Sequence, residues 1–220
     1  MDSYQGTANK VEVLDTIFIA DKGNIKILLL KKETEPYKGY WSLPRGILSS
    51  DNDVLDEADI ISSRLAGLNQ VNFLENRIYS SINRINDERI IGVSCIGLTD
   101  SVTVSLKGSE CPFEYGWFEI NSLPKMIYDH AKIANDSVHD LRNILKNISI
   151  IKKLFPSDFT LPELQSAYEQ INGEELDRRN FRKKIISLNV LEETGENNLG
   201  ESGRPAKLYR FKDDVDGIYF

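Results

Sequence analysis

The stretch FTLPELQSAYEQINGEELDRRNFRKKI, residues 159–185, decides the fold of the carboxyl-terminal part of the chain. It opens on the pattern of a capping box, in which Thr160 is followed three residues later by Glu163, and this pattern marks the start of a helix. Gly173 has the character of a helix end, and Asp177 has that of the N-cap of a second helix. The stretch therefore predicts two consecutive helices joined by a short turn.

Two strand-like segments follow these helices, VLEET at 190–194 and AKLYRF at 206–211. The connection between them is rich in Gly and Asn, so the pair is expected to form a β-hairpin with a long tip. Helix, short turn, helix and hairpin is the order of elements in a winged helix-turn-helix module. We therefore expect a winged helix domain over residues 151–220.

The second of the two helices carries a run of cations, RRNFRKK at 178–184, that contains no acidic residue. Helical periodicity turns Phe181, Ile185 and Leu188 inward, so the cations form a ridge on the outward face. Arg and Asn side chains make the best bidentate contacts to guanine and adenine. The pattern favours a helix that reads double-stranded DNA; a solvated basic face and a protein-binding winged helix are the alternatives.

The predicted DNA contacts fall into two groups. Contacts to base edges are expected from the start of the helix, at Arg178, Arg179 and Asn180. Contacts to the phosphate backbone are expected further along the helix, at Arg182, Lys183 and Lys184. On the hairpin, Arg204 and Lys207 are placed to reach the phosphate backbone or the minor groove.

The first 150 residues contain strand-like runs interrupted by two helix-like segments. The strand-like runs are 11–20, 25–32, 71–82, 90–98, 102–106 and 116–120. The helix-like segments are 52–66 and 134–147. This order favours an α+β fold in which a mixed sheet is packed between helices, in a domain over residues 1–150.

Composition and charge exclude several classes of protein. Of the 220 residues 40% are hydrophobic and 28% charged, which is ordinary for a globular chain and excludes a mainly disordered one. Residues 1–150 have a net charge of −5, whereas residues 151–212 have a net charge of +1. Two cysteines, no leader-like start and no apolar run long enough for a bilayer predict a cytoplasmic protein that does not associate with membranes.

The segment PYKGYWSLPRG at 36–46 resembles the approach to the signature of Nudix domains, and Gly46 and Gly67 have the spacing of that signature's two glycines. The signature places carboxylates on one helix to hold Mg²⁺ against a pyrophosphate. Its acidic positions fall here on Asn52, Ile61, Arg64 and Leu65. The resemblance thus implies a Nudix-fold α/β/α sandwich, while the missing carboxylates argue against catalysis and against a metal site. The acids that do occur on this helix are expected on its solvated face: Asp53, Asp56, Glu57 and Asp59.

The two halves together resemble the Nudix-related transcriptional regulators, the NrtR-like family. Besides 159–185, the matching segments are LLLKKETEPYKGYWSLPRG, LPKMIYDHAKI and GRPAKLYRF. The resemblance implies a homodimeric repressor on a palindromic operator, without a cofactor, that responds to ADP-ribose, an NAD-related metabolite or a pentose sugar. The alternative function is a Nudix hydrolase acting on ADP-ribose or a related nucleoside diphosphate derivative.

In a Nudix fold the ligand lies in the cleft between the sheet and the signature helix. The candidate ligand-binding residues are Tyr40, Trp41, Arg45, Arg89, Asp129 and His130. Tyr40 and Trp41 suit stacking on a base or sugar, although burial in the core is the alternative for Trp41. Arg45 either reaches a phosphate or sugar hydroxyl or blocks the old pyrophosphate site. Arg84, near Arg89, is expected to be an exposed loop charge, with pairing to an anionic effector as the alternative.

Overall fold

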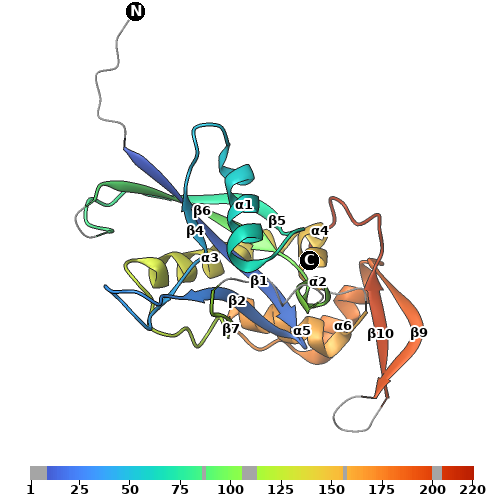
Figure 1. The fold of residues 1–220 in the computed structure, drawn as a ribbon. Helices are drawn as coiled ribbons and strands as arrows, with labels where there is room; N and C mark the ends of the chain where they lie inside the picture. Colours follow the sequence, from blue (N-terminus) through green and yellow to red (C-terminus); the bar gives the residue numbers. More distant parts are fainter. Residues whose placement is uncertain (1–8, 86–87, 106–112, 156–157, 200–204) are drawn as a thin grey trace, which may run out of the picture.

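The computed structural model describes residues 9–85, 88–105, 113–155, 158–199 and 205–220 (Figure 1). Within these residues, the amino-terminal part is built on a seven-stranded mixed sheet. Its strands are β1 (Lys10–Asp21), β2 (Asn24–Lys31), β3 (Trp41–Ser42), β4 (Arg45–Ile47), β5 (Asn72–Tyr79), β6 (Ile90–Leu98) and β7 (Tyr115–Glu119). The main order is β3-β2-β1-β6-β5, with β4 paired to β1 and β7 paired to β2. Only the β1–β6 pair is parallel among these strands.

The β1–β2 hairpin forms the centre of the sheet, because its side chains are apolar on both faces. Lys22 and Gly23 form its turn with backbone φ angles of 49° and 81°. Two consecutive left-handed residues are what a type I′ turn requires, and Gly adopts this conformation at little cost. The strands expected at 11–20 and 25–32 are therefore confirmed.

Helices cover both faces of the sheet, and they are α1 (Val54–Ala66), α2 (Ser101–Ser105) and α3 (His130–Ile144). Neighbouring residues of β1 point to opposite faces: Val13 packs with α1, whereas Leu14 belongs to the cluster that contains Ile133 of α3. The Asp53 carboxylate caps α1, and Gly67 ends the helix with a φ of 66°. The layers are those of the expected α/β/α sandwich.

The strand expected at 102–106 is wrong, because this segment begins the short helix α2. The carboxylate of Asp100 accepts hydrogen bonds from the backbone N–H groups of Val102 and Thr103, both at 2.9 Å. This local cap closes a helical turn and outweighs the preference of Val and Thr for strands.

The carboxyl-terminal part has the order of a winged helix. It consists of α4 (Ile148–Ile151), a 3₁₀ turn (Lys152–Leu154), β8 (Phe159–Thr160), α5 (Leu161–Asn172), α6 (Arg178–Ser187), β9 (Leu191–Leu199) and β10 (Pro205–Phe211). The small sheet has the order β8-β10-β9. The capping box of Thr160 and Glu163 is formed, and Gly173 ends α5 in the left-handed conformation. The two helices and the hairpin expected from the sequence are confirmed.

The two parts share one hydrophobic cluster of buried side chains, which runs from Leu14 and Phe18 in the large sheet to Phe181 and Phe211 in the winged helix. The β1–β2 turn also lies against α5 (Figure 1). A Cβ atom on Gly23 would come within 2.9 Å of the Glu163 Cα atom, so no side chain fits there. Among the described residues, no helix is long and apolar enough to cross a membrane.

Candidate functional site

Helix α6 presents its cations outward, as expected. Asp177 caps the helix by accepting a hydrogen bond from the backbone N–H of Asn180 at 2.8 Å. Phe181 and Ile185 are buried, and the Phe181 ring packs against Tyr168 of α5 with 5.7 Å between the ring centroids. The exposed side chains are Arg178, Arg179, Asn180, Arg182, Lys183 and Lys184. Their charges are therefore held on a rigid, packed element.

The charges of α6 and of the hairpin differ in their pairing. Within the part of the chain that the structure describes, no carboxylate lies in ion-pair distance of Arg178, Arg179, Arg182 or Lys183. Lys184 lies over the Phe220 ring, 4.2 Å from its centroid. On the hairpin, Lys207 pairs with Glu193 at 2.8 Å, and this hydrogen bond lowers the pKa of the Glu193 carboxyl. Arg204 lies outside the described residues.

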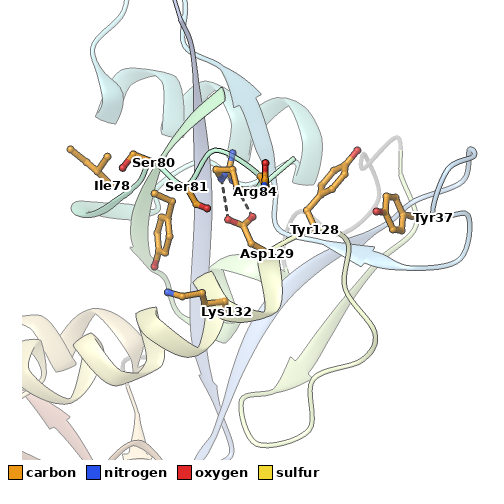
Figure 2. Close-up of a pocket in the computed structure, with 10 residues that line it drawn as sticks. Tyr37, Ile78, Ser80, Ser81, Arg84, Tyr128, Asp129 and Lys132 are labelled. Atoms are coloured by element: carbon orange, nitrogen blue, oxygen red, sulfur yellow. Dashed lines mark hydrogen bonds and ion pairs between the residues drawn. The ribbon is translucent and has the colours of Figure 1, made fainter. Parts of the chain in front are cut away.

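A cavity of about 590 Å³, here called the α3 cavity, opens beside the start of α3 (Figure 2). It is lined by Tyr37, Ile78, Tyr79, Ser80, Ser81, Asn83, Arg84, Tyr128, Asp129 and Lys132. These residues come from the β2–β3 connection, the end of β5 with the loop after it, and the first turn of α3. Aromatic rings, hydroxyls and charged groups are thus brought together from distant segments.

Arg84 is the centre of a buried ion network at the floor of this cavity. Its Nε and Nη2 atoms donate to the carboxylate of Asp129 at 3.0 and 3.3 Å, and its Nη1 atom donates to Glu12 at 2.9 Å. The other oxygen of Glu12 accepts from Arg45 at 2.6 Å. The Arg84 side chain is only 1% exposed, so the expectation of an exposed loop charge is wrong. Burial is tolerated because each guanidinium edge meets a carboxylate.

Two tyrosines of the cavity have strained backbones. Tyr37 and Tyr128 have φ angles of 74° and 45°, which non-glycine residues rarely adopt. Their rings meet edge to face with 5.1 Å between centroids, and the Arg45 guanidinium lies 5.4 Å from the Tyr128 centroid. Strained residues that the surroundings hold in place cluster at binding and catalytic sites. This conformation therefore favours the α3 cavity as a ligand site.

On the opposite wall, Tyr79 and Lys132 are held together. The Tyr79 hydroxyl donates to Asp136 at 3.0 Å, and the Lys132 Nζ atom donates to the same carboxylate at 2.5 Å. Lys132 also lies 5.1 Å from the centroid of the Tyr79 ring. Its side chain remains 66% exposed, so this cation is accessible to a ligand.

The structure places three of the ligand-binding candidates in or beside the cavity. Asp129 lines the cavity. Arg45 donates to Glu12, which belongs to the ion network at the floor of the cavity. Arg89 donates to the backbone oxygen of Ser80, a residue of the cavity wall, at 2.7 Å. The assignment of Asp129, Arg45 and Arg89 to a bound ligand stays a prediction.

The other three candidates contact the protein itself. Tyr40 lies 5.8 Å from Tyr37, and Trp41 packs edge to face on Phe118 at 4.6 Å, as the core alternative requires. His130 is fully buried, and its Nδ1 atom accepts the backbone N–H of Leu43 at 3.0 Å. Burial and then the positive charges of Arg45 and Arg84 lower the pKa of His130 well below its usual value, so the ring is neutral. Ligand contact at these residues also stays a prediction.

The signature helix α1 holds its acids differently from the expectation. Glu57 is buried, not solvated, because it accepts the backbone N–H of Ser49 at 3.1 Å and the side-chain amide of Asn52 at 2.9 Å. Asp53 serves as the helix cap. Among the described residues, no group of three His, Cys, Asp or Glu side chains is placed to hold a metal ion. The donor set therefore does not fit the Mg²⁺ site of a Nudix hydrolase.

A buried acid, Asp15 of β1, lies next to this helix and was missed in the sequence. Both its carboxyl oxygens are buried without a hydrogen-bond partner among the described residues. Burial, and then the nearby charges of Asp59 and Glu57, raise its pKa well above the usual value. The sequence signal was an acid within a mainly apolar strand.

Comparison with known proteins agrees with this architecture. The family model of the NrtR DNA-binding winged helix domain matches residues 151–211. A relative from Acinetobacter baylyi, the ADPR responsive transcriptional repressor NtrR, is 29% identical over 203 residues, which cover 89% of this chain and 79% of the relative. An ADP-ribose pyrophosphatase from Methanocaldococcus jannaschii is 33% identical over 120 residues, which cover 54% of this chain and 68% of that protein.

Among solved structures, Shewanella oneidensis NrtR complexed with a 27mer DNA superimposes with a TM-score of 0.79. The match covers 96% of this chain and 97% of that chain at 20% identity, so it supports the fold of both parts. The winged helix match, the relative aligned along most of the chain and the shared fold lead to one assignment. Residues 151–211 match the NrtR DNA-binding winged helix domain, and the chain along most of its length is similar to the NrtR-like Nudix-related transcriptional regulators, in which a Nudix-fold part is joined to a DNA-binding winged helix.

Proposed function

We propose that this chain is a repressor that binds its operator through α6 and that changes its affinity for DNA when a ligand such as ADP-ribose occupies the α3 cavity. The observation that carries the proposal is the outward face of α6, where exposed cations without carboxylate partners are fixed on the second helix of a helix-turn-helix. Such a face is complementary to the phosphates and base edges of a major groove.

The assignment of base and phosphate contacts follows from the position of each residue along α6. Arg178, Arg179 and Asn180 at the start of α6 are assigned to base edges, and Arg182, Lys183 and Lys184 to phosphates. Lys207 is assigned to phosphate as well, although a phosphate must first displace Glu193 from it.

We place the boundary between the two parts near residue 150, and we propose a homodimer on a palindromic operator.

The chemistry of the α3 cavity suits a nucleotide sugar. Its tyrosine rings offer faces and edges for stacking on a base or a sugar, and the exposed ammonium of Lys132 offers a charge for a phosphate. Asp129 offers carboxylate oxygens to ribose hydroxyls. ADP-ribose contains each of these groups, and the Acinetobacter relative is named for its response to it.

We propose further that the chain does not hydrolyse this ligand. The signature positions are occupied by Asn52, Ile61, Arg64 and Leu65, and the buried Glu57 is engaged by Ser49 and Asn52. A hydrolase of this fold needs carboxylates that are available to Mg²⁺. Incubation with ADP-ribose and Mg²⁺ should therefore release no AMP, and stoichiometric binding without turnover should be found by calorimetry.

The direct test starts from random-site selection of duplex DNA with the full chain. An enriched motif is expected, and Arg179→Ala should weaken binding to it by about tenfold or more, because one bidentate base contact contributes roughly 1–3 kcal/mol. Arg64→Ala, which removes the same charge from α1, should leave the affinity unchanged. If no motif is enriched, a protein-binding winged helix becomes the better assignment.

A further inference from the structure

Strand β1 and helix α3 both connect the α3 cavity with the winged helix. Near the start of β1, Glu12 belongs to the ion network at the floor of the cavity, and the strand leads to the turn that lies against α5. Helix α3 starts directly after Asp129, which lines the cavity, and Arg142 in its last turn contacts α5. Strand β1 and helix α3 therefore both run from the region of the α3 cavity toward α5 of the winged helix (Figure 1).

At the cavity, a single side chain ties these two elements together. The Arg84 guanidinium bonds on one edge to Asp129, which precedes α3 (Figure 2). On another edge it bonds to Glu12 of β1. Asp129 stands at the N-cap position of α3 but its carboxylate makes no capping bond, because it faces Arg84 instead. Further along, a buried hydrogen bond of 3.1 Å joins the hydroxyls of Thr16 and Ser137.

At the winged helix, the last turn of α5 is held by α3 and by the β1–β2 turn. The Arg142 Nε atom donates to the backbone oxygen of Ile171. The Gln170 side chain accepts the backbone N–H of Ile25 at 3.0 Å, and it donates to the backbone oxygen of Gly23 at 2.9 Å. It also donates to the Asn24 side chain at 3.0 Å. A displacement of α3 relative to β1 would thus act on α5 directly.

We propose that Arg84 detects the ligand and that α3, held to α5 by Arg142, carries the change to the DNA-binding helix, while Gln170 holds α5 to the β1–β2 turn. An anionic group that binds an edge of the Arg84 guanidinium, or ligand hydroxyls that bind Asp129, would break one of the two ion pairs by which Arg84 links β1 to the start of α3. Because the Tyr168 ring of α5 packs on Phe181 of α6, α6 follows α5. Arg142 and Gln170 act as positioning residues. This inference rests on the proposed function, since it needs a ligand that alters DNA binding.

The test measures three quantities on the full chain: the Kd for a selected duplex, the Kd for ADP-ribose, and the factor by which saturating ADP-ribose changes the Kd for DNA. Such coupling factors typically lie between about 5 and 150. In Arg142→Ala and Gln170→Ala we expect the two separate Kd values to stay within about threefold of the wild type, while the coupling factor falls at least about fivefold. Loss of coupling with both affinities kept is not expected of a merely structural role.

Lys146→Ala is the matched control, because Lys146 also lies near the end of α3 but its side chain bonds only to Asn143 among the described residues. It should keep the wild-type coupling factor. Coupling that stays at the wild-type value in both Arg142→Ala and Gln170→Ala overturns the inference and leaves the proposed function standing. A wild type whose DNA affinity ignores ADP-ribose instead overturns the proposed function itself, and the inference with it.

Hydrogen exchange on the wild type provides a second measurement that does not depend on variants that fold. ADP-ribose should alter amide protection both at the start of α3 and in the last turn of α5. A change confined to the residues around the cavity overturns the inference.

Arg142→Lys, which keeps the charge but loses the Nε donor, should lose most of the coupling as Arg142→Ala does.

Discussion

Helix α6 and the floor of the α3 cavity both concentrate cations, but they hold the charge in opposite ways. The cations of α6 stand in solvent, and Arg178, Arg179, Arg182 and Lys183 lack a carboxylate partner in the described part of the chain. Arg84 is withdrawn from solvent and bonded on each side to an acid. The exposed cations of α6 can bind a polyanion directly. Arg84 is already paired with two carboxylates, so a ligand can bind it only by displacing one of them.

The difference also separates binding from stability. An exposed cation contributes little to the free energy of folding, so α6 can be altered without unfolding the chain. A buried ion pair leaves an uncompensated charge when one partner is lost. Substitutions in the two regions should therefore change different measurements, and four experiments examine this separation.

The largest effect is expected from Arg84→Met. It leaves Glu12 and Asp129 without their shared partner, and removal of one member of a buried pair costs about 3–5 kcal/mol. The free energy of unfolding in urea should fall accordingly. Arg179→Ala is the control and should change it by no more than about 0.5 kcal/mol. If Arg84→Met and Arg179→Ala lowered the free energy of unfolding equally, the buried and the exposed cations would not differ in their contribution to stability.

Lys183→Ala should act on DNA binding alone. A phosphate contact carries no sequence information, so affinity should fall for specific and random duplexes alike. The slope of log K against log salt concentration should become shallower by about one, as expected for the loss of one neutralised phosphate. An unchanged slope would assign Lys183 to the solvated side of α6.

Asp15→Asn should raise stability at neutral pH. In the folded chain the pKa of Asp15 is raised by burial, so the carboxyl holds its proton to a higher pH than in the unfolded chain, which ionises it near the usual value of 3.8. The stability associated with the neutral acid is therefore present below pH 3.8 and is lost as the pH rises toward the folded pKa. The difference in the free energy of unfolding between variant and wild type should grow as the pH rises from 3.8 toward the folded pKa. A difference that does not vary with pH would contradict a neutral Asp15.

The smallest effect is expected from Glu193→Gln. It releases Lys207 from its partner and removes a negative charge from the hairpin. Binding to DNA should become slightly tighter, and the salt slope should become steeper by up to about one. Glu114→Gln, which releases Lys31 in the other part of the chain, is the control and should leave DNA binding unchanged.

Local signals explain which parts could be predicted from the sequence. The capping box of α5, the Asp177 cap of α6 and the type I′ turn at Gly23 each depend on residues a few positions apart. The burial of Arg84 depends on partners 72 and 45 positions away, Glu12 and Asp129, so no local pattern could indicate it. Such a network becomes visible only when the sheet is formed.

The α3 cavity was hidden for the same reason. Its tyrosines, Tyr37, Tyr79 and Tyr128, come from three separate segments, and no single motif contains more than one of them. Glu57 was placed on the wrong side of α1 because helical periodicity gives the face of a residue but not the bonds that draw a carboxylate inward. The family resemblance supplied the architecture, whereas the positions of these side chains required coordinates.

The shared hydrophobic cluster has a consequence for how the chain comes apart. Because Leu14 and Phe18 of the large sheet belong to the same packed set as Phe181 and Phe211, neither half can be withdrawn without exposing apolar surface of the other. The whole chain should therefore melt in one cooperative step, and a protease cut near residue 150 should leave fragments that aggregate. Replacement of one half by an unrelated domain would leave the other half with an unmatched apolar face.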